Sequence, residues 1–208
     1  MKDAPMKKST PQAPTGALLP RRSLLQAGAA AMLAATPLFA PADEAMAARL
    51  REGGVVLALR HALAPGTFDP PGFRLGDCTT QRNLDGEGRA QAARLGQWAR
   101  ARQLLPARVR SSPWCRCMDT AQLAFGQPEA WDALASPTQA DSALREQRLA
   151  SLRAALRAVP SGRFEAWVTH QFVLQDLAGV STAPAEALVL APGNDASTIV
   201  VLARAALY

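Results

Sequence analysis

The sequence predicts one α/β domain, a three-layer α/β/α sandwich around a mainly parallel central sheet. Short apolar runs alternate along the chain with longer segments of helical periodicity, which is the pattern of βαβ units. Residues 55–59 are apolar at every position, as expected of a strand that is covered on both faces. The 208 residues, 49% hydrophobic and 19% charged, are enough for a single globular domain with a substantial core.

The first predicted strand, residues 55–59, leads directly into Arg60 and His61. Open α/β sheets bind their ligands at the carboxyl ends of their strands, so these two side chains are candidate site residues. A segment rich in proline and glycine follows at residues 64–77 and has no periodicity. Segments of this length without regular structure are usually functional or mobile.

A helix is predicted over residues 84–103, because Asp85 and Glu87 stand at its amino end and apolar residues then recur at helical spacing. A short strand at residues 108–112 and a second helix at 115–124 come next. The alternation continues with a helix at 144–159, a strand at 165–169, a helix at 173–179, and strands at 187–190 and 197–203. The strand at 165–169 ends at His170, so the second histidine has the same position relative to its strand as the first.

The first 47 residues resemble a bacterial twin-arginine export signal. Arg21-Arg22 precede a mildly apolar, alanine-rich run at 27–40, and Ala45-Met46-Ala47 has the small-x-small pattern of a cleavage site. The alternative is a polar tail joined to an ordinary amphipathic helix. We expect the twin-arginine export machinery as a partner, a periplasmic location and a mature domain at 48–208, with membrane attachment only if the leader is retained.

The charge of the mature segment is modest. From residue 48 onward the chain carries 18 arginines against 14 acidic residues, a net charge of +4, and all three lysines lie before it. Arginines that share their helices with acids and lack an aromatic stacking surface are a weak nucleic-acid signal. We therefore expect no nucleic-acid partner.

Four blocks of sequence carry a family resemblance. They stand in order and span most of the mature segment: Leu59-Arg60-His61-Ala62, Leu84-Asp85-Gly86-Glu87-Gly88-Arg89-Ala90-Gln91-Ala92, Ser112-Pro113-Trp114-Cys115-Arg116 with Thr120-Ala121, and Val168-Thr169-His170. Each block alone is weak evidence. Together they resemble the histidine phosphatase superfamily, whose fold is that of the phosphoglycerate mutases.

The resemblance implies a mechanism. Arg60 and Arg116 would hold a phosphate through forked hydrogen bonds. His61, neutral at the attacking nitrogen and fixed by a backbone carbonyl, would form a phosphohistidine that water later hydrolyses. His170 would act as a cation that stabilises the equatorial oxygens of the transferring group. No metal or cofactor is implied, and two histidines with scattered carboxylates make a poor metal site.

The sequence departs from the family pattern at two positions. The glycine that usually follows Arg-His is Ala62, which matters only if the backbone there needs a positive φ. Some relatives have an aspartate directly after the second histidine, where this chain has Gln171. Asp141 is therefore the first candidate for the acid that protonates the leaving group, ahead of Glu146 and Glu129, although an ordinary solvated charge is the alternative for each. Without an acid, only good leaving groups would react well.

Two further positions and the cysteines complete the expected site. Arg82 and Asn83 precede the first long helix and are candidates for substrate contact, with a surface arginine and a helix cap as the alternatives. A disulfide from Cys78 to Cys115 or to Cys117 would pin the loop beside the phosphate. A cysteine-dependent phosphatase is excluded, because no arginine stands six residues after any cysteine.

These observations favour an exported phosphatase that acts on a small-molecule phosphomonoester or on an envelope sugar phosphate. A protein that binds phosphate or a phosphosugar in the same pocket, with weak or no turnover, is the alternative, because the acid is missing.

Overall fold

The structure is a computed structural model that describes residues 41–207. The arginine pair and most of the predicted leader lie outside the described residues. Within residues 41–207, no helix is both long enough and apolar enough to cross a bilayer.

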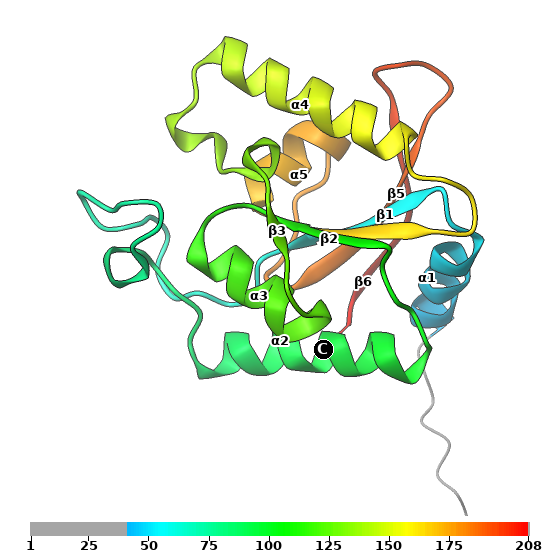
Figure 1. Cartoon of the computed structure of the whole chain (residues 1–208), viewed down its shortest axis with the longest axis horizontal. Helices are drawn as coiled ribbons and strands as arrows, with labels where there is room; N and C mark the ends of the chain where they lie inside the picture. The colour runs from blue at the N-terminus through cyan, green and yellow to red at the C-terminus, as the bar shows by residue number, and fades with distance from the viewer. Residues whose placement is uncertain (1–40, 208) are drawn as a thin grey trace, which may run out of the picture. The chain divides into compact units, whose positions relative to one another are not determined.

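Six strands form one sheet in the order β3-β2-β4-β1-β5-β6 (Figure 1). Strands β3, β2, β4 and β1 are parallel neighbours, whereas β5 is antiparallel to both β1 and β6. Strand β5 is thus the single reversed strand, and the prediction of a mainly parallel sheet is confirmed. The strands are β1 (Val55–Arg60), β2 (Arg108–Ser111), β3 (Glu129–Ala130), β4 (Phe164–Thr169), β5 (Glu186–Pro192) and β6 (Ile199–Ala206).

Within residues 41–207, five α-helices cover the two faces of the sheet (Figure 1). Helices α1, α2 and α3 pack on one face, where Leu50, Leu95 and Ala121 join one apolar core. Helices α4 and α5 pack on the other face through Leu152 and Leu174. The three predicted layers are therefore present. The helices are α1 (Pro41–Glu52), α2 (Gly86–Ala101), α3 (Cys115–Phe125), α4 (Ser142–Arg157) and α5 (Gln171–Ala178), with three short 3-10 turns between them at Cys78–Thr80, Asp132–Leu134 and Pro137–Gln139.

Strand β1 shows why its sequence is apolar at every position. Leu57 and Leu59 point into the core under α1, α2 and α3, while Val56 and Ala58 point into the core under α4 and α5. Successive side chains of a strand face opposite sides of a sheet, so a central strand between two helical layers has no solvent-facing position.

Helix α1 contains the predicted cleavage site. Met46 and Ala47 are fully buried in the core beneath this helix. Cleavage after Ala47 would remove half of α1 from the sheet, whereas cleavage before Pro41 would leave the helix whole. The boundary at residue 47 stays a prediction.

Candidate active site

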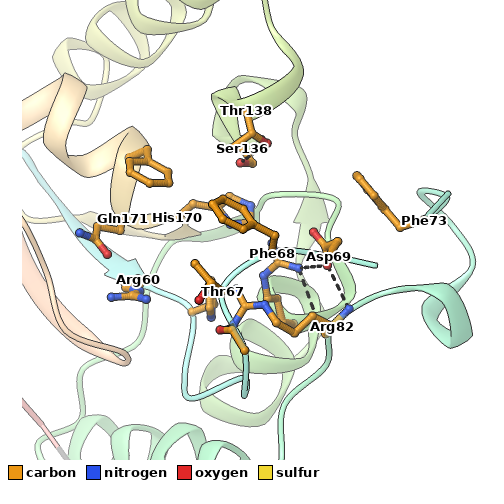
Figure 2. A pocket seen from close by; sticks show the side chains of 14 residues that line it. Arg60, Thr67, Phe68, Asp69, Phe73, Arg82, Ser136, Thr138, His170 and Gln171 are labelled. Carbon is orange, nitrogen blue, oxygen red and sulfur yellow. Dashed lines mark hydrogen bonds and ion pairs between the residues drawn. The ribbon is translucent and has the colours of Figure 1, made fainter. Parts of the chain in front are cut away.

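One cavity of about 400 Å³ lies at the carboxyl ends of β1 and β4 (Figure 2). Its wall combines the end of β1, the loop that follows β1, the first turn of α3 and the first turn of α5. Two helices therefore begin beside the cavity, with the positive ends of their dipoles near it. A site built in this way favours an anion.

The register of the sheet brings the two histidines together. Arg60 of β1 pairs with Thr169 of the parallel neighbour β4, so the next residues, His61 and His170, leave the sheet side by side. Their ring centroids are 5.5 Å apart, in an edge-to-face arrangement. The His61 N–H donates to the Thr169 carbonyl at 2.9 Å, which extends the ladder of sheet hydrogen bonds into the site.

His61 is prepared to act as a neutral nucleophile. Its Nδ1 lies 2.8 Å from the Ala62 carbonyl, and because a carbonyl can only accept, Nδ1 carries the proton. The Nε2 atom then has a free lone pair. Burial lowers the pKa of His61 to about 3; the Ala62 carbonyl opposes this shift, and the nearby guanidinium of Arg116 adds to it. The ring is therefore neutral at physiological pH.

The surroundings of His170 favour its neutral form. It is buried, and burial together with His61 and the nearby guanidinium groups lowers its pKa well below the ordinary histidine value. Both effects favour the neutral ring, so the cationic role expected of His170 during phosphoryl transfer stays a prediction. Its Nε2 bonds the Ser112 hydroxyl at 2.8 Å, and the Trp114 ring packs edge-on against it at 5.2 Å. A phosphate dianion in the cavity would raise the pKa again.

The backbone after His61 is held by residues of two of the four sequence blocks, the block at 84–92 and the block at 112–121. The Ala62 N–H donates to the Thr120 hydroxyl of α3 at 3.0 Å, and the Leu63 N–H donates to the Gln91 side chain of α2 at 2.9 Å. Gly88 lets α2 approach this segment, because a Cβ at that position would lie 2.0 Å from the Leu63 carbonyl oxygen. The glycine, glutamine and threonine of the motifs therefore position the histidine-bearing strand end.

The substitution of alanine for the usual glycine at position 62 has a simple explanation. Ala62 is fully buried, and it is not among the described residues with a positive φ. A methyl group fits, and the backbone conformation does not require glycine.

Three guanidinium groups line the cavity. Arg116, the second residue of α3, is buried, while Arg60 and Arg82 are partly exposed. Arg60 donates from Nη1 to the Thr182 carbonyl at 2.8 Å. Burial and then the charge of Arg116 lower the pKa of both Arg60 and Arg82, which is the mutual repulsion expected where cations gather without enough anions. A phosphate would relieve that repulsion.

Asp69, in the long loop, is a site residue that the sequence does not reveal. Its carboxylate accepts from Arg116 Nη1 at 2.7 Å and from the Arg82 backbone N–H at 2.9 Å (Figure 2). It also accepts from the Trp114 indole N–H at 3.0 Å. Burial opposes ionisation, but the Arg82 N–H and the Arg116 guanidinium outweigh it and lower the pKa of Asp69. Among the described residues that line the cavity, Asp69 alone has a carboxylate, and it is ionised and fully partnered.

Two of the residues predicted for the site lie elsewhere. Asn83 does not line the cavity; its side-chain amide donates to the Cys78 carbonyl at 2.7 Å and so supports the loop. Asp141 is exposed and caps α4 by accepting from the Leu144 N–H at 2.8 Å. Asp141 thus has the ordinary helix-capping role of its residue type.

The other two acids named as candidates also lie outside the cavity. Glu129 pairs with Arg108 at 2.7 Å, and Glu146 is exposed. The structure therefore places no free carboxylic acid among the described residues that line the cavity.

The cysteines divide into one bonded pair and one buried thiol. Cys78 and Cys115 form a disulfide, the first of the two pairings left open by the sequence. The bond joins the loop to the first residue of α3, beside Arg116. Cys117 is fully buried 3.6 Å from the His170 ring, and burial raises the pKa of its thiol to about 12. A thiol of this kind is not a nucleophile at neutral pH.

The described part of the chain contains no group of three or more histidine, cysteine or carboxylate side chains placed to hold a metal ion. The chemistry of the cavity is that of two neutral imidazoles among three guanidinium groups and one engaged carboxylate.

Two solved structures are similar to this chain. A structure from Mycobacterium tuberculosis, that of the open reading frame Rv3214, is 20% identical with a TM-score of 0.54, over 72% of this chain and 96% of that chain. The putative phosphohistidine phosphatase SixA from Agrobacterium tumefaciens is 25% identical with a TM-score of 0.47, over 73% of this chain and 96% of that one. The similarity to the Mycobacterium tuberculosis structure shows that this chain has the same fold.

A comparison with curated protein sequences found no match. The family model of the histidine phosphatase superfamily, branch 1, matches residues 74–183, which is more than half of the chain. The chain therefore belongs to the histidine phosphatase superfamily.

Proposed function

We propose that this protein is a phosphomonoester hydrolase that works through a phosphohistidine on His61. The observation that carries the proposal is the neutral His61, with its proton fixed on Nδ1, beside three guanidinium groups in one cavity. Membership of the histidine phosphatase superfamily supports phosphatase activity.

In the proposed reaction the three arginines neutralise the phosphate oxygens and align the ester. His61 Nε2 attacks phosphorus as the bond to the leaving-group oxygen breaks, and charge spreads over the equatorial oxygens. His170, whose Nε2 is taken by Ser112, would face these oxygens with its other nitrogen. Water then attacks the phosphohistidine, the P–N bond breaks, and inorganic phosphate and neutral His61 are regenerated.

None of the described residues that line the cavity is a free acid that could protonate the leaving group. Asp69 is ionised and bound to Arg116, and Asp141 caps a helix away from the cavity. We therefore expect the rate to depend steeply on the basicity of the leaving group, with aryl phosphates favoured over alkyl phosphates.

We further propose that the substrate is met outside the cytoplasm, in the periplasm or at the cell envelope, after export by the twin-arginine machinery. The disulfide between Cys78 and Cys115 supports an oxidising compartment. Envelope sugar phosphates are the substrate class that this location favours. The reaction is proposed to need neither metal nor cofactor, and the membrane would be a partner only if the leader is retained.

A phosphate-binding protein with little or no turnover is the second candidate. The specific observation in its favour is the engaged state of Asp69, the one carboxylate among the described residues of the cavity.

The deciding experiment is rapid quenching of the oxidised protein with labelled p-nitrophenyl phosphate, followed by mapping of the acid-labile phosphate. Label on His61 and loss of turnover by at least about 10³-fold in His61→Ala support the hydrolase. Tight binding of phosphate without any turnover would instead favour the binding protein. Label on another residue would contradict the proposed mechanism.

A further inference from the structure

The cavity is larger than a phosphate group held by its histidines and arginines would require. Its volume of about 400 Å³ is within the range of roughly 300–1,000 Å³ that small-molecule sites have. The histidines and arginines account for one part of the wall, where the phosphate would bind. The remaining wall must contact the group that carries the phosphate.

That remaining wall is aromatic. Three of the six phenylalanines in the chain, Phe68, Phe73 and Phe172, line this single cavity. Phe73 has a packing role, because its ring lies 5.9 Å from that of Trp114. Phe68 and Phe172 are 71% and 47% exposed. Large apolar side chains that are exposed around a cavity typically mark a binding surface.

The two exposed rings come from parts of the chain that the phosphate site already orders. Phe172 is the second residue of α5 and stands two positions after His170. Phe68 directly precedes Asp69, whose carboxylate is bonded to Arg116 and Trp114. A ring placed beside such fixed residues contacts a ligand at little extra conformational cost.

Three of the four polar side chains on this wall, Ser136, Thr138 and Gln171, are already partnered, and Thr67 is the fourth. The Ser136 and Thr138 hydroxyls bond each other at 3.1 Å, and the Gln171 amide donates to the Ser181 hydroxyl at 3.0 Å. Figure 2 shows Ser136 and Thr138 on a side of the hollow away from Arg60 and Arg82. This part of the cavity therefore offers ring faces more readily than free hydrogen-bonding groups.

We infer that Phe68 and Phe172 form a leaving-group subsite that selects phosphomonoesters whose leaving group presents an apolar ring face. The inference rests on the proposed function and names the substrate class of the same site. An aromatic ring and the C–H face of a sugar ring share this chemistry, since both pack on an aromatic side chain.

The test is calorimetric binding of two matched pairs of ligands to the oxidised full-length protein. Benzylphosphonate is compared with pentylphosphonate, and the non-hydrolysable phosphonate analogue of glucose 6-phosphate with that of sorbitol 6-phosphate, so each pair differs in having a ring or an open chain. We expect the ring member of at least one pair to bind about tenfold more tightly. A preference in the first pair identifies an aromatic leaving group, and one in the second pair identifies a sugar ring.

Substitutions of Phe68 and Phe172 test whether these two rings cause the preference for ring-bearing ligands. Phe68→Ala and Phe172→Ala should each reduce the ring preference several-fold while leaving the affinity for inorganic phosphate within about twofold. Leu105→Ala is the matched control, because Leu105 is 77% exposed and lies outside the cavity; it should leave the preference unchanged. Equal affinities within both pairs, or a preference that survives both phenylalanine substitutions, would overturn the inference.

Binding is measured without turnover, so the two proposals can fail separately. Absence of p-nitrophenyl phosphate hydrolysis together with a ring preference would refute the hydrolase and leave the subsite supported. Hydrolysis without a ring preference would refute the subsite alone.

Discussion

The two halves of the candidate site are held in place by different means. The half at the strand ends contains His61 and His170, whose backbones continue the hydrogen bonds of the central sheet. The half in the loop after β1 contains Phe68 and Asp69, and no strand or α-helix of its own supports it. A disulfide and a buried carboxylate hold that loop against α3 instead.

Substitutions in the two halves should therefore have different effects on stability and on ligand binding. A change at the strand ends disturbs buried backbone, so it should affect the stability of the whole domain. A change in the loop should lower stability as well, because a disulfide and the Asp69–Arg116 ion pair tie the loop to α3, and it should in addition weaken ligand binding while the sheet stays intact. Measuring stability and ligand binding in the same variants tests that distinction.

Loss of the disulfide should have the largest effect on the loop half. Replacing both cysteines, Cys78→Ser with Cys115→Ser, opens a link across 37 residues and should lower the free energy of unfolding by about 4 kcal/mol. KM for p-nitrophenyl phosphate should rise more than kcat falls, because the arginine-bearing segments lose their cross-link. Urea denaturation and steady-state kinetics measure the two effects. An unchanged KM in the folded double variant would show that the disulfide does not order the site.

Asp69→Asn tests the ion pair within the loop half. The substitution keeps the shape but removes the charge that faces Arg116, and breaking a buried pair of this kind should cost about 3 kcal/mol of stability. We expect kcat/KM to fall as well, since Arg116 loses a fixed partner. The control is Asp119→Asn, whose exposed pair with Arg89 should contribute at most about 1 kcal/mol. Equal losses in the two variants would refute a positioning role for Asp69.

Gly88→Ala tests the strand-end half without touching a polar group. The new Cβ would meet the Leu63 carbonyl at 2.0 Å, so the segment beside His61 must shift, at about 2–3 kcal/mol. Gly86→Ala, in the first turn of the same helix, meets nothing within 4 Å and should instead stabilise the protein by up to about 1 kcal/mol. Thermal unfolding of both variants checks the contrast. Similar melting temperatures would mean that α2 does not need this close approach.

The buried histidine should also make stability depend on pH. The pKa of His61 is about 3 in the folded protein, below the unfolded value of about 6.5, so the unfolded chain binds a proton that the folded protein does not. Lowering the pH from 7 to 5 should therefore cost about 2 kcal/mol through this group. Urea denaturation at both pH values should show a smaller loss in His61→Asn than in the unaltered protein. Equal losses would mean that His61 titrates normally when folded.

Strand and helix order could be predicted from the sequence because burial imposes it directly. The apolar run of β1 and the helical spacing in α2 are consequences of two cores on either side of one sheet. The same logic placed both histidines at strand ends and Arg116 near the start of a helix. For Asp141 the stated alternative was an ordinary solvated charge, and its exposed position agrees with that alternative.

The contacts across the loop could not be predicted in this way. Nothing in the spacing of Asp69 marks it as the partner of Arg116, which is 47 positions further along the chain. The neutral state of His170 likewise depends on burial and on three guanidinium groups that gather only in the folded protein.

The layers of the fold and the residue types that meet at the carboxyl ends of β1 and β4 could therefore be predicted from the chain alone, because periodicity and strand termini are local properties of the chain. The folded structure was needed to establish which carboxylate is engaged, which cysteines are joined and which rings line the cavity. Those features depend on distances between residues far apart in sequence, and a local pattern carries no information about them.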